Sequence, residues 1–481
     1  MRDHRMWIGG QWVPSESGRM MTTKNPSTGE DHAGVPKASA ADIDAAVRAA
    51  REAFPVWSGM TQAERNKVLY EIAAKIREEA DAMARDECAE HGTPYNDAYG
   101  VCMGAAAKFE WSANAAYRLM GEEIPVPGDT LTYLKNEPVG VIGFITPWNL
   151  PTIMTAVKLA PALAVGNTCV LKPPSINSAI GLKFAHVLSQ VPSLPKGVVN
   201  IVTGSGSEAG AALASHPEVD LIGFTGSSET GKEILALAAP TVKKCVMELG
   251  GNNPVLIFPD ADIDASLKVL AWRQFNNSGQ HCSGPGRYYV HESVYDEFAA
   301  KFKAYAESLK VGDTTSGDKS IQMGPLVSAE HKAKVLGYIS GAVAEGATVL
   351  TGGDAGTQYG SGFFVKPTVL TGCTHDMTCA REEIFGPVAV LIRYTDSDDL
   401  VTMANDSRFG LCAHIWTRDI SKGMKLISTL HVGAVFINCQ MLTDEQPWGT
   451  SVKESGIGKE GGIFGMREFV DKKLVCVKYG E

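Results

Sequence analysis

The chain has 481 residues and a formal net charge of −10, with apolar (44%) and charged (20%) fractions that are ordinary for a globular protein. This length favours two or three domains, and the negative charge argues against binding to nucleic acid or to an acidic membrane surface. No apolar run reaches the ~18 residues that cross a bilayer. Residues 1–15 lack the apolar segment of a signal peptide, so we expect a cytoplasmic protein with no nucleic-acid or membrane partner.

Ten cysteines are scattered along the chain without a CxxC pair or a Cys/His cluster of zinc spacing, which predicts reduced thiols and no metal site. Several pack as small hydrophobic side chains in apolar, strand-like runs, namely Cys169, Cys245, Cys412 and Cys476. Cys282 differs from them because it lies in the glycine-rich turn "NNSGQHCSGPGR" (276–287).

The N-terminal part of the chain is predicted to be mainly helical. Residues 7–13, "WIGGQWV", form an expected strand pair with a Gly-Gly turn, and residues 38–54 carry apolar side chains at helical spacing. A second helix is expected over residues 61–80, where Thr61 and Glu64 have the spacing of a capping box.

From residue 139 onward, short β-rich runs alternate with helical stretches, which is typical of βαβ units on a parallel sheet. The first series of predicted strands comprises 139–145, 168–172, 198–202, 221–225 and 243–249. The second comprises 253–258, 287–291, 387–394, 411–417 and 433–438. The sequence therefore predicts two α/β domains with a boundary near residue 250.

Two further segments, 121–138 and the C-terminal "KKLVCVKYG", are predicted to be exposed strands outside both series. Because exposed strand edges need covering, we expect them to pair with another subunit.

Two glycine-rich turns are candidates for binding a dinucleotide. Residues 203–210, "TGSGSEAG", follow a strand and open a helix, but their GxGxxxG spacing departs from the usual GxGxxG fingerprint. Residues 224–231, "FTGSSETG", are the better candidate, because Gly226 and Gly231 flank a helix start that can hold a pyrophosphate.

Cys282 is a candidate nucleophile, since glycines let its backbone approach a ligand closely. Backbone amides, His281 or Arg287 are available to supply the positive potential that a thiolate needs. A structural thiol under a loop remains the alternative. A Cys/His hydrolase is weakly supported, because adjacent side chains in an extended segment point to opposite sides.

Polar residues also lie where predicted parallel strands end. Asn149 follows the first strand in "TPWNLP", and Glu248 ends the last strand of the first series in "MELGGNNP". The segments "EEIFGP" (382–387) and "PWGTSVKESGIGKEGG" (447–462) border strands of the second domain. Such positions are where α/β sheets bind ligands, so we expect a cleft between the two domains.

In this order, "TPWNLP", "FTGS", "ELGGNNP", "NSGQHC", "EIFGP" and "SGIGKEGG" resemble the aldehyde dehydrogenase superfamily, NAD(P)-dependent enzymes that oxidise aldehydes to acids. The resemblance covers nearly the whole chain. It implies an α/β fold with a Rossmann-like cofactor domain (1–120 and 139–249), an α/β catalytic domain (250–440) and a small β oligomerisation arm (121–138 and 466–481). It also implies a homodimer or homotetramer.

By position, the resemblance implies that Cys282 attacks the aldehyde to form a thiohemiacetal and, after hydride transfer, a thioester. Asn149 and the Cys282 N–H would form the oxyanion hole, and Glu248 would be the general base for hydrolysis. NAD or NADP would be held by Ile145, Trp148, Lys172, Ser175, Gly226, Ser227, Glu383 and Phe385.

Three positions depart from the family pattern. Ser175 replaces a glutamate that many members place against the adenosine ribose; beside Lys172, a serine is able to donate a hydrogen bond to a 2′-phosphate, so NAD and NADP both stay open. Asn252 and Thr450 are also unusual, and we expect neither to affect the chemistry.

The substrate pocket implied by the resemblance comprises Leu150, Met154, Val157, His281, Ser283 and Trp448, with the loop 440–446. Leu150 and Val157 leave room for a medium-sized or aromatic aldehyde. No arginine falls in these segments, and Asp444 and Glu445 add negative charge, so an aldehyde with a distal carboxylate is disfavoured.

Two alternatives remain at this stage. A CoA-acylating dehydrogenase would pass the thioester to coenzyme A, but such branches usually lack a glutamate at the Glu248 position. A non-catalytic protein on the same fold is the other alternative, and the joint presence of Cys282, Glu248 and Asn149 argues against it.

Overall fold

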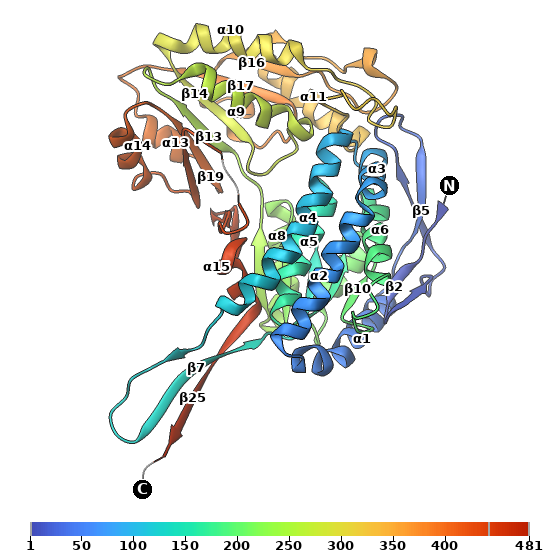
Figure 1. Ribbon diagram of the computed structural model, residues 1–481. Helices are drawn as coiled ribbons and strands as arrows, with labels where there is room; N and C mark the ends of the chain where they lie inside the picture. The colour runs from blue at the N-terminus through green and yellow to red at the C-terminus, as the bar shows by residue number, and fades with distance from the viewer. Residues whose placement is uncertain (1, 441–442, 480–481) are drawn as a thin grey trace.

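The computed structural model describes residues 2–440 and 443–479 as two α/β regions and a projecting β arm (Figure 1). The predicted α/β fold class is confirmed. None of the helices in the described ranges is long and apolar enough to cross a membrane.

The first region is built on an eight-stranded sheet of order β23-β12-β11-β8-β9-β10-β2-β3. Its five central strands are parallel and buried: β8 (Val141–Ile145), β9 (Thr168–Lys172), β10 (Val199–Ile201), β11 (Leu221–Thr225) and β12 (Lys244–Glu248). All five were predicted, because parallel strands covered on both faces are continuously apolar. The antiparallel edges are β2 (Met6–Ile8), β3 (Gln11–Val13) and β23 (Gly456–Ile457).

Helices pack around this sheet and carry its apolar core (Figure 1). They are α1 (Ala40–Gly59), α2 (Gln62–Glu78), α3 (Ala80–Glu90), α4 (Tyr95–Ala115), α5 (Pro151–Ala164), α6 (Ser178–Ser189), α7 (Ala211–Ser215) and α8 (Ser228–Ala238). The capping box predicted at Thr61 and Glu64 opens α2, and Ser39 forms a second one with Asp42 at α1. Each box satisfies free N–H groups at a helix start, which fixes where the helix begins.

The second region contains a seven-stranded sheet of order β15-β16-β17-β14-β13-β19-β20. The predicted strands are β13 (Asn253–Ile257), β14 (Pro285–His291), β17 (Val388–Tyr394), β19 (Cys412–Trp416) and β20 (Ala434–Ile437). The prediction missed β15 (Thr348–Thr351) and β16 (Thr368–Cys373), which are short and contain threonines. The helices are α9 (Ile263–Phe275), α10 (Glu292–Ser308), α11 (Ala329–Ala344), α12 (Thr378–Arg381), α13 (Leu400–Asn405) and α14 (Ile420–Ile427).

The arm consists of β6 (Glu122–Glu123), β7 (Thr130–Pro138) and β25 (Val470–Lys478), and it extends away from both regions (Figure 1). β25 pairs with β7 along its whole length, from Val470 opposite Pro138 to Lys478 opposite Thr130. The expectation that these strands need another subunit as their partner is therefore wrong for this pair of edges. The outer edge of β25 pairs with no strand within the described residues.

The predicted start of the C-terminal arm at residue 466 also needs correction. Met466 ends the short helix α15 (Gly462–Met466), and it is buried with Phe469 in the core of the first region. The arm strand begins at Val470 because these apolar side chains anchor the preceding turn to that core.

After the second sheet, the chain returns to the first region through short β pairs; apart from Phe409–Gly410, the prediction assigned their strands to no domain. They are β18 (Phe409–Gly410) with β22 (Val452–Lys453) and β21 (Gly449–Thr450) with β24 (Lys459–Glu460). A separate small sheet near the N-terminus contains β1 (Arg2–Asp3), β4 (Met20–Lys24) and β5 (Asp31–Pro36). Because β23 pairs with β12 at Glu248, this return places residues 449–460 beside the end of β12.

Candidate active site

A cavity of about 230 Å³ brings together residues from both α/β regions, including Asn149, Glu248 and Cys282. Asn149 follows β8, Glu248 ends β12, and Cys282 lies in the turn before β14. The predicted pocket residues all line the same cavity: Leu150, Met154, Val157, His281, Ser283 and Trp448. In the predicted loop 440–446, residues 441 and 442 lie outside the described residues. A larger hollow of about 730 Å³ beside α3 and α6 is lined by no cysteine or serine.

The turn before Cys282 has an unusual backbone. Asn277, Ser278 and Gly279 adopt successive positive φ angles of 51°, 56° and 72°, which is costly for residues with a Cβ atom. The Asn277 amide donates to the Asn149 carbonyl at 2.6 Å, and a Cβ on Gly279 would lie 2.2 Å from the Gly386 carbonyl oxygen. Tertiary contacts thus hold a strained turn in place and fix the position of the thiol.

Asn149 is buried, and its side-chain nitrogen donates to the Gln280 carbonyl at 2.8 Å. An amide nitrogen has two protons, so one remains for a ligand. The backbone N–H of Cys282 has no acceptor within residues 2–440 and 443–479. Two donors are therefore available where the predicted oxyanion hole would form.

Burial, followed by the nearby carboxyls of Glu383 and Glu248, raises the pKa of the Cys282 thiol to about 12, while Arg273 acts in the opposite direction. The thiol is thus protonated at neutral pH, and forming the reactive thiolate requires a base.

Glu248 lies beside a buried ion pair. Lys158 of α5 and Glu460 of β24 are 2.5 Å apart, with side chains only 1% and 5% exposed. A Cβ on Gly449 would lie 2.5 Å from Glu248 Oε1, so no side chain fits between this carboxyl and β21. Burial and the charge of Glu460 raise the pKa of Glu248 well above its usual value, and Lys158 opposes this rise.

Sequence analysis missed Lys158 and Glu460. Lys158 stands in an otherwise apolar stretch of α5, "TIMTAVKLAPALA", and a lysine with apolar neighbours on every side was the available signal. A buried lysine requires a carboxylate partner, but the sequence does not indicate that the partner lies about three hundred residues away.

The predicted cofactor residues lie along the carboxyl ends of the first sheet. Ser227 is the N-cap of α8, and its Oγ accepts from Thr230 N at 3.2 Å. Lys172 ends β9; its ammonium donates to the Pro173 carbonyl at 3.0 Å, and burial lowers its pKa to about 8. Ser175 is exposed three residues further on.

The other glycine-rich turn lies beside these residues. A Cβ on Gly210 would meet Lys172 Cδ at 3.7 Å and Ile145 Cδ1 at 3.9 Å, so the absent side chain leaves space at Lys172. The 203–210 turn therefore borders the crevice, although its spacing is not the usual fingerprint.

Glu383 and Phe385 approach this crevice from the second region. Glu383 Oε1 accepts from Gly251 N at 2.9 Å, and burial raises its pKa to about 7. Phe385 adopts φ 57° and packs edge-on against Trp148, with ring centroids 5.3 Å apart.

The residues of the crevice fit a dinucleotide. They provide a helix N-terminus for a pyrophosphate, a buried lysine, and carboxylate oxygens that accept from ribose hydroxyls. Buried hydroxyls of Thr146 and Thr225 have no partner within the described part of the chain, which is consistent with a polar ligand beside them.

Comparisons with known proteins agree with this geometry. A model of the aldehyde dehydrogenase family matches residues 12–475. Human retinal dehydrogenase 2 is 40% identical over 480 residues, which cover 98% of this chain and 92% of that protein. The chain belongs to the aldehyde dehydrogenase family.

Solved aldehyde dehydrogenase structures share the whole fold. The NAD+ complex of an aldehyde dehydrogenase from Bacillus cereus has a TM-score of 0.95 and 38% identity, covering 99% of this chain and 97% of that one. An NADP dependent enzyme from E. coli has a TM-score of 0.95 and 36% identity, covering 99% and 98%. The predicted family, fold and enzyme class are confirmed: the protein is an NAD(P)-dependent oxidoreductase that acts on aldehydes.

One charged residue of this aldehyde dehydrogenase was not foreseen. Arg273, near the end of α9, lines the cavity that contains Cys282, although it lies outside the predicted pocket segments; the argument that a distal carboxylate lacks a partner there no longer holds. Its Nη2 donates to Ser283 Oγ at 2.7 Å. Arg273 precedes Cys282 by nine residues on a helix, and nothing in the local sequence shows which way its side chain points.

The argument that His281 must point away from the thiol is also wrong. The Gly284 N–H bonds to the His281 carbonyl at 3.1 Å, so the segment is a turn rather than extended, and both side chains line the cavity. His281 is still a poor general base. Its Nε2 lies 3.1 Å from Asn276 Oδ1, and burial, followed by the charge of Arg273, lowers its pKa well below the usual value.

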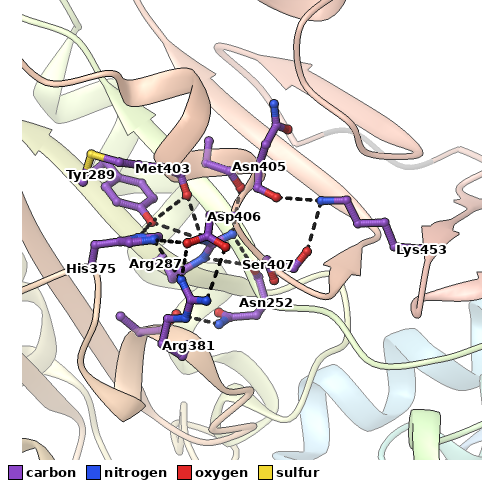
Figure 2. Close-up of polar contacts among 12 residues, drawn as sticks. Asn252, Arg287, Tyr289, His375, Arg381, Met403, Asn405, Asp406, Ser407 and Lys453 are labelled. Carbon is purple, nitrogen blue, oxygen red and sulfur yellow. Dashed lines mark hydrogen bonds and ion pairs between the residues drawn. The ribbon is translucent and has the colours of Figure 1, made fainter.

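Arg287, a predicted source of positive potential for the thiolate, has a structural role in the aldehyde dehydrogenase (Figure 2). Its guanidinium is buried and donates to the carbonyls of Asn252, Met403 and Ala404 at 3.0–3.2 Å. It thereby ties the segment after β12 to the end of α13. The unusual Asn252 lies outside the residues that line the Cys282 cavity, and its side-chain amide donates to the Ala380 carbonyl at 2.8 Å.

The same network continues outward from Arg287. Tyr289 Oη lies 2.8 Å from His375 Nδ1, and His375 Nε2 lies 3.0 Å from Asp406, which also pairs with Arg381 (Figure 2). All three nitrogens of the Arg287 guanidinium donate to acceptors within the protein, which is the pattern of a structural brace.

Proposed function

We propose that this aldehyde dehydrogenase uses Cys282 as its nucleophile and releases a free carboxylic acid. The observation that carries the proposal is the shared cavity of Asn149, Glu248 and Cys282, with two unpaired donors beside the thiol. The Cys282 sulfur attacks the carbonyl carbon, a C–S bond forms, and the carbonyl π pair moves onto oxygen. The Asn149 amide and the Cys282 N–H hold that oxyanion, and the thiol proton passes to a base.

A dinucleotide bound beside this cavity would supply the acceptor for the hydride, one hydrogen with two electrons, that leaves the tetrahedral carbon. Cys282 then carries the acyl group as a thioester. Glu248 removes a proton from water, the resulting hydroxide attacks the thioester carbon, and the C–S bond breaks to give the acid and the Cys282 thiolate.

The ion pair of Lys158 and Glu460 supports Glu248 in this role. A general base works best with a pKa near the working pH, and burial with the charge of Glu460 moves the pKa of Glu248 upward from its usual value.

The test is a panel of aldehydes assayed with NAD and with NADP, with product identification in the presence and absence of coenzyme A. Free acid as the product supports hydrolysis assisted by Glu248. Acyl-CoA as the main product would instead establish the CoA-acylating alternative. Cofactor binding without turnover of any aldehyde would favour a non-catalytic role.

We further propose that the enzyme accepts both NAD and NADP. Ser175 is exposed near the end of β9, where Lys172 is buried without a carboxylate partner in the described ranges, and a 2′-phosphate would meet no negative charge from these two residues. The NAD+ complex and the NADP dependent enzyme among its structural neighbours are consistent with either cofactor. The ratio of kcat/KM for the two cofactors tests this, and a value for NADP far below that for NAD would refute it.

Oligomerisation through the arm is a separate proposal. The arm exposes apolar side chains, Leu131, Leu474, Val477 and Tyr479, and leaves the outer edge of β25 unpaired within the described residues. We propose a homodimer or homotetramer, tested by light scattering of the native protein and of Leu474→Asp.

All ten cysteines are free thiols, which supports a reducing compartment such as the cytoplasm.

A further inference from the structure

Two cationic side chains line the cavity of Cys282, and their surroundings differ. Lys108, from α4, is paired with the carboxylate of Asp444, so this pair adds no net charge. Arg273 has no carboxylate within ion-pair distance anywhere in residues 2–440 and 443–479. The cavity therefore has one uncompensated positive charge.

The hydrogen bonds of Arg273 are also incomplete. A guanidinium has five N–H donors, and the only acceptor found among the described residues is Ser283 Oγ. The Nε of Arg273 is buried without a partner. Leaving a buried cation unpaired is unfavourable, whereas a ligand that supplies an anion removes the cost.

Neighbouring titratable groups do not compensate this charge at neutral pH. Burial raises the pKa of the Cys282 and Cys412 thiols, so both are protonated. Burial lowers the pKa of His414 to about 3 and that of His281 well below its usual value, so both rings are neutral. The Glu248 carboxyl, whose pKa is raised, lies beside Lys158 and Glu460 instead.

The rest of the cavity wall suits a hydrocarbon chain. It is formed largely by apolar side chains, Leu150, Ile153, Met154, Val157, Leu411, Phe436 and Trp448. An apolar wall with one cation and one nucleophile matches a ligand that carries an aldehyde at one end and an anionic group at the other.

We propose that Arg273 anchors a carboxylate of the substrate, so that the preferred substrates are aldehydes that carry a second, acidic group. This inference rests on the proposed function of the Cys282 cavity. The planar fork of Arg273 matches both oxygens of a carboxylate. Ser283, whose oxygen already accepts from Arg273, retains its hydroxyl proton to donate to the same group.

The experiment compares matched substrate pairs: hexanal with its terminal carboxylate analogue, and benzaldehyde with its para-carboxylate. Steady-state kcat and KM are measured at saturating cofactor for the native enzyme, Arg273→Gln and Arg273→Lys. In the native enzyme, kcat/KM for the carboxylated member of at least one pair should exceed that of the neutral member by about 10- to 100-fold, as for a charge-assisted pair. Arg273→Gln should bring this ratio close to one, mainly by raising KM for the carboxylate, and Arg273→Lys should retain part of it.

A matched control removes the other cation that lines the cavity together with the carboxylate that it pairs with. The double variant Lys108→Gln with Asp444→Asn deletes one cation and one anion together, so the carboxylate preference should persist. Loss of the preference in this double variant would place the anchor at Lys108 and overturn the assignment to Arg273.

Other outcomes separate the anchor from the underlying reaction. Oxidation of neutral aldehydes by the native enzyme with no preference for either carboxylate refutes the anchor alone, and this result needs no folded variant. Failure to oxidise any aldehyde refutes the proposed function itself. If Arg273→Gln lowers kcat equally for both members of a pair and leaves their KM ratio unchanged, Arg273 acts on the Cys282 thiol rather than on the substrate.

Discussion

Cations in the two α/β regions have different partners. Lys158, beside Glu248 in the first region, is paired with Glu460 of the same chain. Arg273, beside Cys282 in the second region, has no carboxylate partner among the described residues. A cation that the protein neutralises itself tunes its neighbours, whereas a cation left open toward a cavity is a candidate binding group for an external anion.

Lys172 resembles Arg273, because it too has no carboxylate partner among the described residues. It is buried, and its only hydrogen-bond acceptor in the described ranges is the neutral carbonyl of Pro173. Two unpaired cations, one toward the cofactor crevice and one toward the Cys282 cavity, thus correspond to two kinds of ligand.

The largest expected effect tests whether the cavity beside Arg273 is the reaction site. Cys282→Ala should lower kcat by more than about 10³-fold, because the covalent intermediate is lost while the fold is preserved. Cys439→Ser, which changes an exposed thiol, serves as the control and should retain activity. Turnover by Cys282→Ala at a rate near that of the native enzyme would exclude the thioester route.

The paired cation should matter most for stability. Lys158→Met leaves Glu460 buried without its partner and should lower the free energy of unfolding by about 3–5 kcal/mol. The double variant Lys158→Met with Glu460→Leu should recover most of this loss. Urea unfolding followed by circular dichroism measures both, and equal instability of the single and double variants would show that the pair is not the cause.

A carboxylate placed near the unpaired Lys172 should change the choice between NAD and NADP. Ser175→Glu places a carboxylate near the end of β9 and should lower kcat/KM for NADP by about 10- to 100-fold through repulsion of the 2′-phosphate, with a much smaller change for NAD. Ser175→Ala is the matched control. Equal losses with both cofactors would mean that Ser175 lies away from the phosphate.

The smallest expected effect is a shift of the pH profile of kcat. The Glu460 charge raises the pKa of Glu248, and Lys158 lowers it. Glu460→Gln removes the first influence and leaves the second, so the pKa of Glu248 should fall and the rising limb of activity should move to lower pH. The comparison requires hydrolysis to limit kcat, which a pre-steady-state burst of reduced cofactor establishes. A limb that stays in place, or moves to higher pH, would contradict Glu248 as the group that titrates.

The elements that the sequence predicts correctly are those in which the local residue pattern matches the burial of the side chains. The five parallel strands of the first sheet are apolar throughout because helices cover both faces, and their bounds differ from the predicted ones by at most two residues. The capping box at Thr61 was also predictable, because the residues that start a helix lie close together in the sequence. β15 and β16 were missed although their threonine, valine and leucine residues favour strands.

Some residues of the candidate site were predicted from sequence, and others were not. Asn149, Glu248 and Cys282 follow or precede recognisable strands, so their approach to one cavity was predictable from strand direction. The partners that set their charge were not predictable, because Glu460 returns from the far end of the chain and Arg273 projects from a helix whose rotation is set by packing.

From the sequence alone, three features were predictable: the two α/β regions, the order of their strands along the chain, and the thiol, carboxyl and amide that line one cavity. The tertiary structure was needed to show that β7 and β25 pair with each other, that Arg287 braces a loop away from the thiol, and that Arg273 borders the cavity with no counter-charge among the described residues. The spacing of apolar residues along the sequence indicates which side chains are buried. The partner of a buried charge depends on contacts between segments hundreds of residues apart, and no local pattern encodes them.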